Sequence, residues 1–375
     1  MTVDSEDAWA RGEFRAATDA SAAALAERSG GEPFRDGVRP IEAARALHEH
    51  GRRCWHLARF DEAHRCLQRA YDLRASTLGA GHPDTLATLE RLAALAEYTG
   101  DIDLARARFD EVITGLRAAD VPATRVAVAQ RNLAAALRNS GDTDAAAALI
   151  ADDVRPVLAQ LPDAHPDHVD LLKGEATLAS WQDPARAFQP SRLAARAAIA
   201  CWGETHPFTA GAQLTLAKSQ LARGRDVDAY ARLELVTAVF ARAYGPHPLL
   251  AIAYDAMSHC RQEQRGRCRD NARRAYEMYR AVYPTPMAYG FGERYLDLLL
   301  VDYDLMKAEP LASDLQTIAP AELYRVALRL ANAYADLGLR DDAMRWLARG
   351  RTAPVPAEHR DEIDLWIREL DAQLA

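Results

Sequence analysis

The sequence predicts an all-α protein, a right-handed superhelical solenoid built from antiparallel helix pairs. A His-Pro dipeptide recurs along the chain, and its successive copies are 83, 41 and 41 residues apart. The four copies are His82-Pro83, His165-Pro166, His206-Pro207 and His247-Pro248. Hydrophobic residues make up 49% of the chain and aromatic residues only 7%, which fits a helical core rich in Ala and Leu. Recurring units of this length with two helical patterns each are typical of helical solenoids.

Further prolines complete the series of helix starts. Val121-Pro122 takes the place of the pair missing from the first interval, and the same spacing leads back to Pro40 and forward to Pro286 and Pro320. The resulting intervals of 34 to 44 residues predict about eight repeats between residues 40 and 353.

The unit from Pro83 to Val121 shows the expected pair of helices most clearly. Proline is compatible with the first helical turn, where its missing N–H would have no partner. Apolar residues from Leu86 to Leu95 follow the helical period up to Gly100-Asp101, where glycine can adopt the left-handed conformation that ends a helix. A second helical pattern, which includes Phe109, completes the unit.

The same spacing recurs around other turns of the chain. The turn positions are Ala58, Gly100, Gly141, Gly224 and Gly338. Five residues after each turn comes a small residue, namely Ala63, Ala105, Ala146, Ala229 and Ala343. Nine residues after each turn comes a larger one, namely Leu67, Phe109, Ile150, Leu233 and Leu347. Small residues allow two helices to approach closely, and the larger ones fill the space beside them.

This pattern resembles the tetratricopeptide repeat. The intervals near 41 residues, the GHPDT sequence at 81–85 and the LARFDEA sequence at 57–63 are similar to the longer, kinesin-light-chain-like variety. The resemblance covers roughly residues 40 to 350 and is weakest in the units that contain 182–190, 262–269 and 286–319. It implies that the first helix of each pair lines a concave surface, and that the ligand is an extended peptide or a partner helix.

The two ends of the chain are expected to cap the solenoid. Residues 1–39 are predicted to be a degenerate half-repeat followed by a Gly-rich linker, and 40–353 the solenoid itself. Residues 354–375 are predicted to be a capping helix with Ile363, Trp366 and Leu370 on one face. Such helices cover the exposed apolar face of a terminal repeat. The same terminal helix is a candidate surface for a homodimer.

The register of the repeat places a set of polar side chains on the concave surface. In proteins that this chain resembles, the position nine residues before each turn often carries a peptide-contacting Asn, and Asn132 matches that type. The predicted peptide-binding residues are Arg52, Glu90, Arg91, Arg131, Asn132, Lys173, Thr215, Lys218, Arg294, Arg329 and Asn332. Cationic side chains along a groove suit an acidic or carboxylate-ended peptide. Alternatively, these cations pair with Glu90, Asp170, Glu293 and Asp297 and only solvate the surface.

Composition excludes several other classes of protein. The net charge of −8 argues against a nucleic-acid binder. The five scattered cysteines form no CxxC motif and favour a reducing, cytoplasmic environment. No signal peptide is recognisable at the N-terminus, and no run of 18 apolar residues is present, so a soluble protein without membrane contact is expected.

A His- and Cys-rich segment is the densest cluster of titratable residues, and it consists of His48, His50, Cys54, His56, His64 and Cys66. Zinc binds such side chains, and i, i+4 spacing can chelate it. However, Arg52 stands where an HExxH motif needs its second His, and His50 and Cys54 coincide with core positions of the repeat. We therefore interpret the segment as structural and predict neither a metal site nor a cofactor.

The favoured function is a non-catalytic scaffold or adaptor that binds a protein or peptide in its concave groove, because the sequence contains no GxSxG motif and no P-loop. A peptide-controlled regulator is a variant of this hypothesis. The alternative is an enzyme or accessory subunit that acts on a peptide. Irregular units could form its pocket, with candidates His259, Tyr289, Glu293, Arg294 and Asp297.

Overall fold

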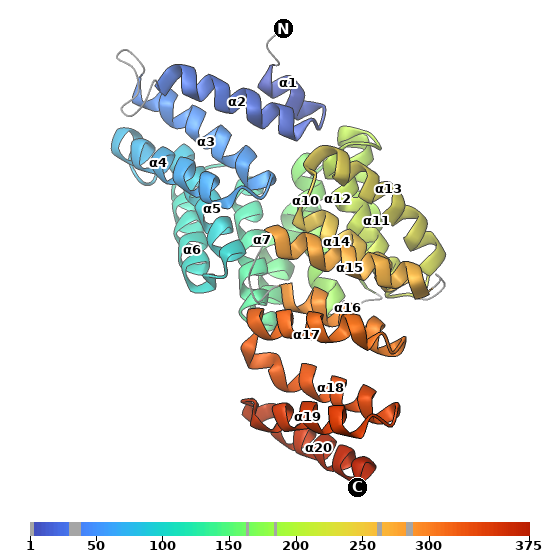
Figure 1. Cartoon of the computed structure of the whole chain (residues 1–375). Coiled ribbons are helices and arrows are strands. Elements are labelled where there is room, and N and C mark those ends of the chain that lie inside the picture. The colour runs from blue at the N-terminus through green and yellow to red at the C-terminus, as the bar shows by residue number, and fades with distance from the viewer. Residues whose placement is uncertain (1–3, 30–38, 163–164, 184–185, 261–264, 283–287) are drawn as a thin grey trace. The chain divides into compact units, whose positions relative to one another are not determined.

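A computed structural model describes residues 4–29, 39–162, 165–183, 186–260, 265–282 and 288–375. Helices connected by turns and short loops make up this part of the chain, and it contains no β-strand. The chain divides into two compact units, Met1–Gly245 and Pro246–Ala375 (Figure 1). The predicted linker after Ser29 lies almost entirely outside the described residues, as do parts of the three irregular segments.

Unit 1 contains two N-terminal helices, α1 (Ser5–Ala10) and α2 (Phe14–Ser29), followed by five helix pairs. The first three pairs are α3 (Pro40–His56) with α4 (Phe60–Leu78), α5 (Pro83–Thr99) with α6 (Ile102–Ala118), and α7 (Ala123–Asn139) with α8 (Thr143–Leu149) and α9 (Arg155–Leu158), which a π-helical turn joins. The other two are α10 (Pro166–Gln182) with α11 (Phe188–Trp202) and α12 (Pro207–Leu221) with α13 (Asp226–Tyr244).

Unit 2 contains three further pairs and a terminal helix. The pairs are α14 (Pro248–Ser258) with α15 (Arg265–Val282), α16 (Tyr289–Val301) with α17 (Leu305–Ile318), and α18 (Leu323–Asp336) with α19 (Arg340–Thr352). The final helix, α20 (Arg360–Leu374), packs on α18 and α19 and buries Ile363, Leu370 and Leu374. The described residues thus contain eight consecutive helix pairs, and the fold class predicted from the sequence is confirmed.

The His-Pro pairs work as helix starts through a specific hydrogen bond. In each pair the histidine is the N-cap residue, and its Nδ1 accepts a hydrogen bond from the backbone N–H two residues later. The N···N distances are 3.1 Å for His82, 3.2 Å for His165 and His206, and 3.1 Å for His247. Proline at the first helical position removes a further N–H that would lack a partner.

The small residues after each turn lie in the core between paired helices. Ala63, Ala105, Ala146 and Ala229 are fully buried, as are the larger residues Leu67 and Phe109 one turn later on the same helices. Gly51 shows how tight this contact is, because a Cβ atom there would lie 2.8 Å from Cγ of Leu67. The spacing read from the sequence therefore corresponds to the core of each pair.

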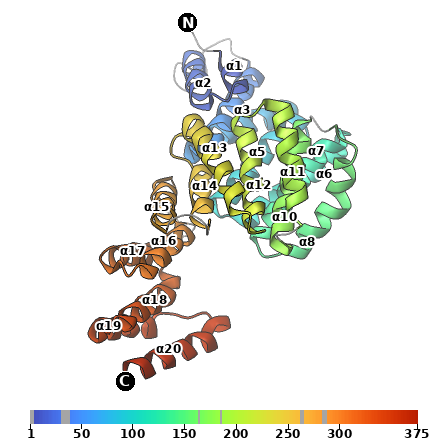
Figure 2. The ribbon, with the colours of Figure 1, turned by 90° about the vertical axis from the view of Figure 1, so that its right-hand side faces the viewer.

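The N-terminal helices do more than cap the first repeat. They pack on α3 and also reach the fifth pair, so the two ends of unit 1 are in contact (Figure 2). The ring of Phe14 lies 5.2 Å from Phe208 and 5.4 Å from Tyr244, centroid to centroid. The Arg15 guanidinium donates a hydrogen bond to the Arg242 carbonyl at 3.0 Å. At the turn between α1 and α2, Gly12 has a φ of +76°, and a Cβ there would lie 2.4 Å from Cδ of Pro207.

Candidate ligand-binding groove

The first helices of the pairs in unit 1 bring most of the predicted binding residues together. Helices α3, α5, α7, α10 and α12 pack side by side in this order. They carry Arg52, Glu90, Arg91, Arg131, Asn132, Lys173, Thr215 and Lys218. We call the surface that these eight residues form the first-helix face of unit 1.

Glu90 lies at the centre of a polar network on this face. Its carboxylate is 1% exposed and accepts hydrogen bonds from Asn132 Nδ2 at 2.8 Å and from the Arg125 guanidinium at 3.2 Å. A carboxylate that is buried and doubly hydrogen-bonded ties α5 to α7. Asn132, the one residue of the type expected from the resemblance, is therefore engaged with a neighbouring helix.

Arg131 and Lys173 share one carboxylate on α10. The terminal nitrogens of Arg131 and Lys173 lie 3.9 Å and 3.7 Å from the oxygens of Asp170. Gly174 makes room for the arginine, because a Cβ there would lie 2.4 Å from Cγ of Arg131. Nε of Arg131 is buried and finds no hydrogen-bond partner in the part of the chain that the structure describes. Two cations thus face a single carboxylate at ion-pair distances that are long.

The other residues of this face have local contacts. The Arg52 guanidinium donates to Glu49 at 2.8 Å and stacks on the Trp9 ring, 4.9 Å from its centroid. The Thr215 hydroxyl donates to the Gly211 carbonyl at 3.2 Å. Lys218 is exposed.

Arg91 differs from all of them. Within the described ranges its guanidinium makes no hydrogen bond and no ion pair, although the side chain is half-buried. Burial lowers the pKa of Arg91; Glu90 and Asp170 oppose this change, whereas Arg52 and Arg125 add to it. A partly desolvated guanidinium without a fixed partner is less favourable than one that a carboxylate neutralises, because both its charge and its N–H groups favour a hydrogen-bonded environment.

A cleft of about 330 Å³ opens beside Arg91, between α5 and the start of α7. Its lining includes His48, Asp84, Glu90, Pro122 and Arg125. Burial, with a smaller contribution from Arg74, lowers the pKa of His48 to about 3, so this imidazole is neutral at physiological pH. Pro122 is the N-cap of α7 and provides no side-chain cap, so the positive end of this helix faces the same region.

The predicted binding residues of unit 2 are all engaged. The Arg294 guanidinium donates to the Ser258 carbonyl at 2.7 Å, and Asn332 donates to Asp336 at 3.1 Å. One nitrogen of Arg329 lies 2.9 Å from Glu293 and 3.0 Å from Asp297. For Arg131, Lys173 and Arg329 the contacts therefore match the alternative drawn from the sequence, in which the cations pair with nearby acids.

The residues considered for a catalytic pocket are brought together only in part. The Tyr289 hydroxyl donates to Glu293 at 3.5 Å, and burial raises the pKa of Tyr289. His259 instead lies 3.7 Å from Asp255, one turn earlier in the chain. Glu293 and Asp297 belong to an ion-pair network around Arg329, to which His259 contributes no contact among the described residues.

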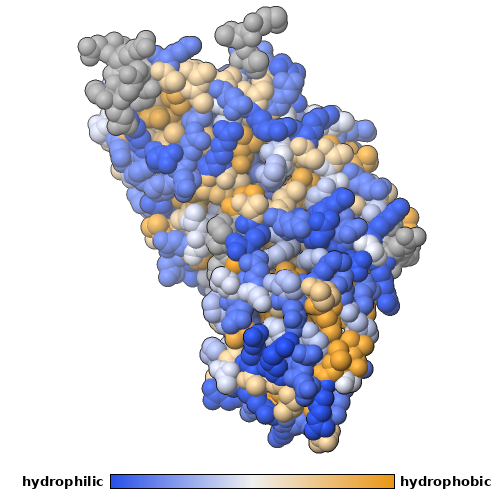
Figure 3. All heavy atoms as spheres, in the orientation of Figure 1, coloured by the Kyte–Doolittle hydropathy of each residue, from blue (hydrophilic) through white to orange (hydrophobic). Residues whose placement is uncertain are grey.

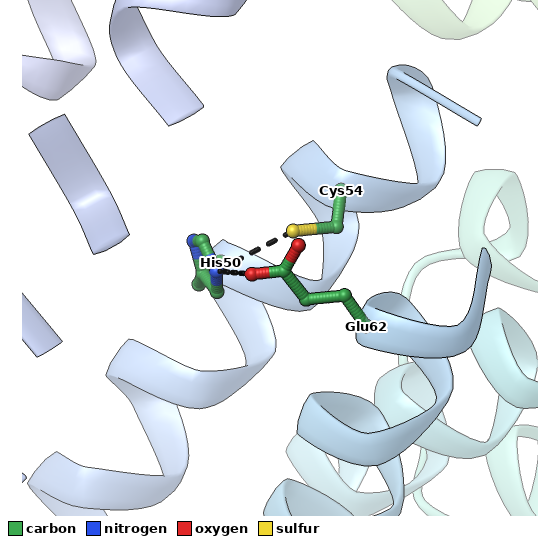
Figure 4. Close-up of side chains that lie close together, drawn as sticks. All are labelled: His50, Cys54 and Glu62. Atoms are coloured by element: carbon green, nitrogen blue, oxygen red, sulfur yellow. Dashed lines mark hydrogen bonds and ion pairs between the residues drawn. The ribbon is translucent and has the colours of Figure 1, made fainter. Parts of the chain in front are cut away.

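A second cluster lies where α3 meets α4 and consists of His50, Cys54 and Glu62, which point toward one another (Figure 4). Nε2 of His50 is 3.0 Å from Oε1 of Glu62 and 3.4 Å from Sγ of Cys54. The burial predicted for His50 and Cys54 is observed. Sequence reasoning missed Glu62, which stands eight residues after Cys54 on the paired helix.

The surface offers two further features. Figure 3 shows a mostly hydrophilic face with an apolar area over the ends of α17 and α18. Large exposed apolar side chains of unit 2 lie at or beside the α16–α17 and α18–α19 turns, among them Val301, Met306, Leu337 and Leu339. Within the described residues, we find no helix with the length and hydropathy required to cross a bilayer.

Comparison with known proteins identifies the repeat. Residues 42–118 match the family model of the tetratricopeptide repeat, so the resemblance predicted from the sequence is confirmed there. No curated protein matches the chain. A solved structure of kinesin light chain TPR-like repeats from Podosopora anserina is 23% identical, covers 55% of this chain and 98% of its own, and has a TM-score of 0.40.

Two solved structures share the fold over most of this chain. A Rap protein complexed with competence and sporulation factor is 11% identical, covers 89% of this chain and 98% of its own, and has a TM-score of 0.57. A STAND signal-transduction ATPase with a tetratricopeptide repeat sensor, from Pyrococcus horikoshii, is 13% identical, with a TM-score of 0.58. The match covers 96% of this chain and 54% of the ATPase. Solenoids of this kind present extended binding surfaces.

Proposed function

We propose that this tetratricopeptide-repeat chain is a non-catalytic scaffold or adaptor, and that the first-helix face of unit 1 binds an acidic peptide segment of a partner protein. The observation that carries the proposal is Arg91, a half-buried guanidinium that has no hydrogen-bond or ion-pair partner among the described residues. A ligand carboxylate would supply this partner through a charge-assisted hydrogen bond.

The charge balance around Arg91 supports an anionic ligand. The first-helix face of unit 1 carries five cationic side chains, whereas the acids in contact with them or beside them are Glu49, Glu90 and Asp170. Glu90 is already neutralised by Arg125, and Asp170 is shared by two cations. A peptide with two or more carboxylates would find positive charge on successive helices.

Two further observations fit a binding protein in the cytoplasm. The fold is similar to that of a Rap protein whose structure was solved as a complex with competence and sporulation factor. All five cysteines are free, as expected in a reducing compartment.

The test compares peptide binding by wild type with that of a charge-reversed variant, Arg91→Glu/Arg131→Glu. Fluorescence anisotropy is measured with labelled peptides of equal length that are acidic, neutral or basic. We expect wild type to prefer the acidic peptide and the variant to lose about 100-fold in affinity for it, because two charge-assisted contacts of about 1.5 kcal/mol each are replaced by repulsion.

The matched control is Arg65→Glu/Arg196→Glu, which changes the net charge equally but on exposed positions of the second helices α4 and α11. This control should bind within about twofold of wild type at moderate salt, where charges far apart are screened. Circular dichroism should show that all variants remain helical. Equal acidic-peptide affinity in wild type and Arg91→Glu/Arg131→Glu would refute the proposal.

A further inference from the structure

The cluster at the junction of α2, α3 and α4 contains three different metal-ligand side chains. His50 and Cys54 lie one turn apart on α3, and Glu62 reaches them from the first turn of α4. Their ligand atoms Nε2, Sγ and a carboxylate oxygen all lie within 4.8 Å of one another (Figure 4). His50 is 3% exposed and Cys54 fully buried, whereas the Glu62 side chain is 37% exposed.

The hydrogen bonds of Ser21, on α2, determine which nitrogen of His50 carries a proton. The Ser21 hydroxyl lies 2.8 Å from the Thr18 carbonyl oxygen and 2.8 Å from Nδ1 of His50. A carbonyl only accepts, and a hydroxyl has one hydrogen to donate. Both contacts are hydrogen bonds only if Ser21 donates to Thr18 and accepts from the Nδ1–H of His50. In the neutral imidazole, Nε2 then presents its lone pair to Cys54 and Glu62.

Three electron-rich atoms therefore converge with a single proton between them. The Cys54 thiol can donate to Nε2 or to the Glu62 carboxylate, but not to both. The remaining lone pairs would face each other in a largely buried site, which is unfavourable. Either a second proton, which makes His50 an imidazolium paired with Glu62, or a cation bound by all three atoms resolves this conflict.

The two separations measured from Nε2 of His50 are slightly shorter than those expected around a tetrahedral metal ion. Zinc bonds of about 2.1 Å to nitrogen and oxygen and 2.3 Å to sulfur place neighbouring ligand atoms about 3.4 to 3.6 Å apart. The observed separations from Nε2 are 3.0 Å to Oε1 and 3.4 Å to Sγ. Small shifts of these side chains would accommodate an ion.

We propose that His50, Cys54 and Glu62 form a binding site for a divalent transition-metal ion of the zinc class. The mixed nitrogen, sulfur and oxygen ligand set favours zinc over calcium or magnesium, which prefer all-oxygen sites. The exposed side of Glu62 leaves the fourth position to water. Binding replaces the S–H bond of Cys54 with a metal–thiolate bond and releases that proton to solvent, with no change in oxidation state.

Ser21 is a positioning residue in this proposal. By accepting the Nδ1–H it orients the His50 ring, which is the usual role of a residue behind a metal-bound histidine. Because Ser21 belongs to α2, the ion would link the N-terminal helices to the first helix pair.

The experiment is a titration of the full chain, under reducing conditions, with zinc chloride followed by calorimetry and with cobalt chloride followed by absorption. We expect one ion per chain, a thiolate-to-cobalt charge-transfer band, and release of about one proton per ion near neutral pH. Cys54→Ser should abolish the charge-transfer band and, like Glu62→Gln, weaken binding about 100-fold. Ser21→Ala should weaken it about 10- to 100-fold.

Cys201→Ser is the control, because it removes a partly exposed thiol on α11 that lies outside the cluster. It should bind zinc as wild type does. Glu62→Gln keeps the experiment decisive if Cys54→Ser fails to fold, since Glu62 is partly exposed. Absence of stoichiometric zinc binding, as expected for an imidazolium–carboxylate pair, or zinc affinity unchanged in Cys54→Ser and Glu62→Gln would overturn the proposal.

Discussion

The two units of the chain carry similar arginines on their first helices but satisfy them differently. In unit 2, Arg294 and Arg329 are fixed by the Ser258 carbonyl and by two carboxylates, respectively. In unit 1, Arg91 has no hydrogen-bond or ion-pair partner within the described residues, and Arg131 approaches its single carboxylate only to 3.9 Å. The same residue type is therefore paired with neighbouring groups in unit 2, whereas in unit 1 Arg91 has no such partner among the described residues.

The units also differ in how their ends are covered. The terminal helix of unit 2 packs on the last helix pair, α18 and α19, whereas α1 and α2 of unit 1 contact both α3 and the fifth pair. Unit 1 thus holds its first and last helix pairs together through contacts between residues about 200 positions apart in the sequence. If the first-helix face binds the extended peptide proposed above, the contacts between the two ends of unit 1 would lower the ordering cost of binding.

The largest effect is expected from loosening the N-terminal helices. Phe14 is fully buried, and its ring contacts those of Trp9, Phe208 and Tyr244. Phe14→Ala should destabilise unit 1 by about 3 to 5 kcal/mol. Hydrogen exchange should show lost protection in α1, α2 and α13, with unit 2 unchanged. Unchanged protection in Phe14→Ala would mean that α1 and α2 do not hold unit 1 together.

The control is Leu235→Ala, which alters a side chain that is 72% exposed. This variant should lose less than about 0.5 kcal/mol of stability.

These long-range contacts mark the limit of what the sequence predicted about the fold. The helix pairs were predictable because their signals are local: His82 caps the helix that Pro83 begins, and Gly100 ends it at a φ of +90°. The docking of Phe14 onto Phe208 has no local signal, because it depends on the rotation accumulated over five helix pairs. The N-terminal segment was therefore predicted only as a degenerate half-repeat.

In the candidate site, too, features with a local sequence signal were predicted and contacts between different helix pairs were not. Repeat register predicted the helix and approximate face of Arg91 and Arg131, since both follow from counting back from a turn. It did not predict that Glu90 accepts hydrogen bonds from Arg125 and Asn132, because these hydrogen bonds join two different helix pairs. Register also missed Glu62, because the contact between it and His50 requires knowledge of how α3 lies against α4.

Two smaller effects on stability, opposite in sign, should distinguish the paired Arg329 from the unpaired Arg91. Arg329→Met leaves Glu293 and Asp297 facing each other without a cation, so we expect unit 2 to lose about 1 to 2 kcal/mol. Arg91→Met removes a partly desolvated charge without breaking a hydrogen bond or ion pair among the described residues, and the stability of this variant should be unchanged or up to about 1 kcal/mol higher. Urea unfolding of both variants measures the difference. A loss in Arg91→Met as large as that in Arg329→Met would show that Arg91 has a structural role.

The smallest effect concerns the protonation of Asp297. Burial raises the pKa of this carboxyl above its ordinary value of 3.8, and Arg329 opposes the rise. Removing the cation in Arg329→Met should therefore raise the pKa of Asp297 further, which carbon-detected NMR titration can measure. The native state binds this proton more tightly than the unfolded chain does. Its contribution to stability is therefore present below the unfolded pKa and is lost as the pH rises through the folded pKa.

In Arg329→Met this loss should extend to higher pH than in wild type, because the folded pKa of Asp297 is higher. Glu97 in unit 1 provides the internal reference. Burial raises the pKa of Glu97, and the cations that oppose this rise are Arg138 and Arg131, which the Arg329→Met variant retains. Its titration should not change in this variant. If the pKa of Asp297 also stayed the same, the contact with Arg329 would contribute little to unit 2, and the contrast between its paired arginine and the free Arg91 of unit 1 would lose its energetic basis.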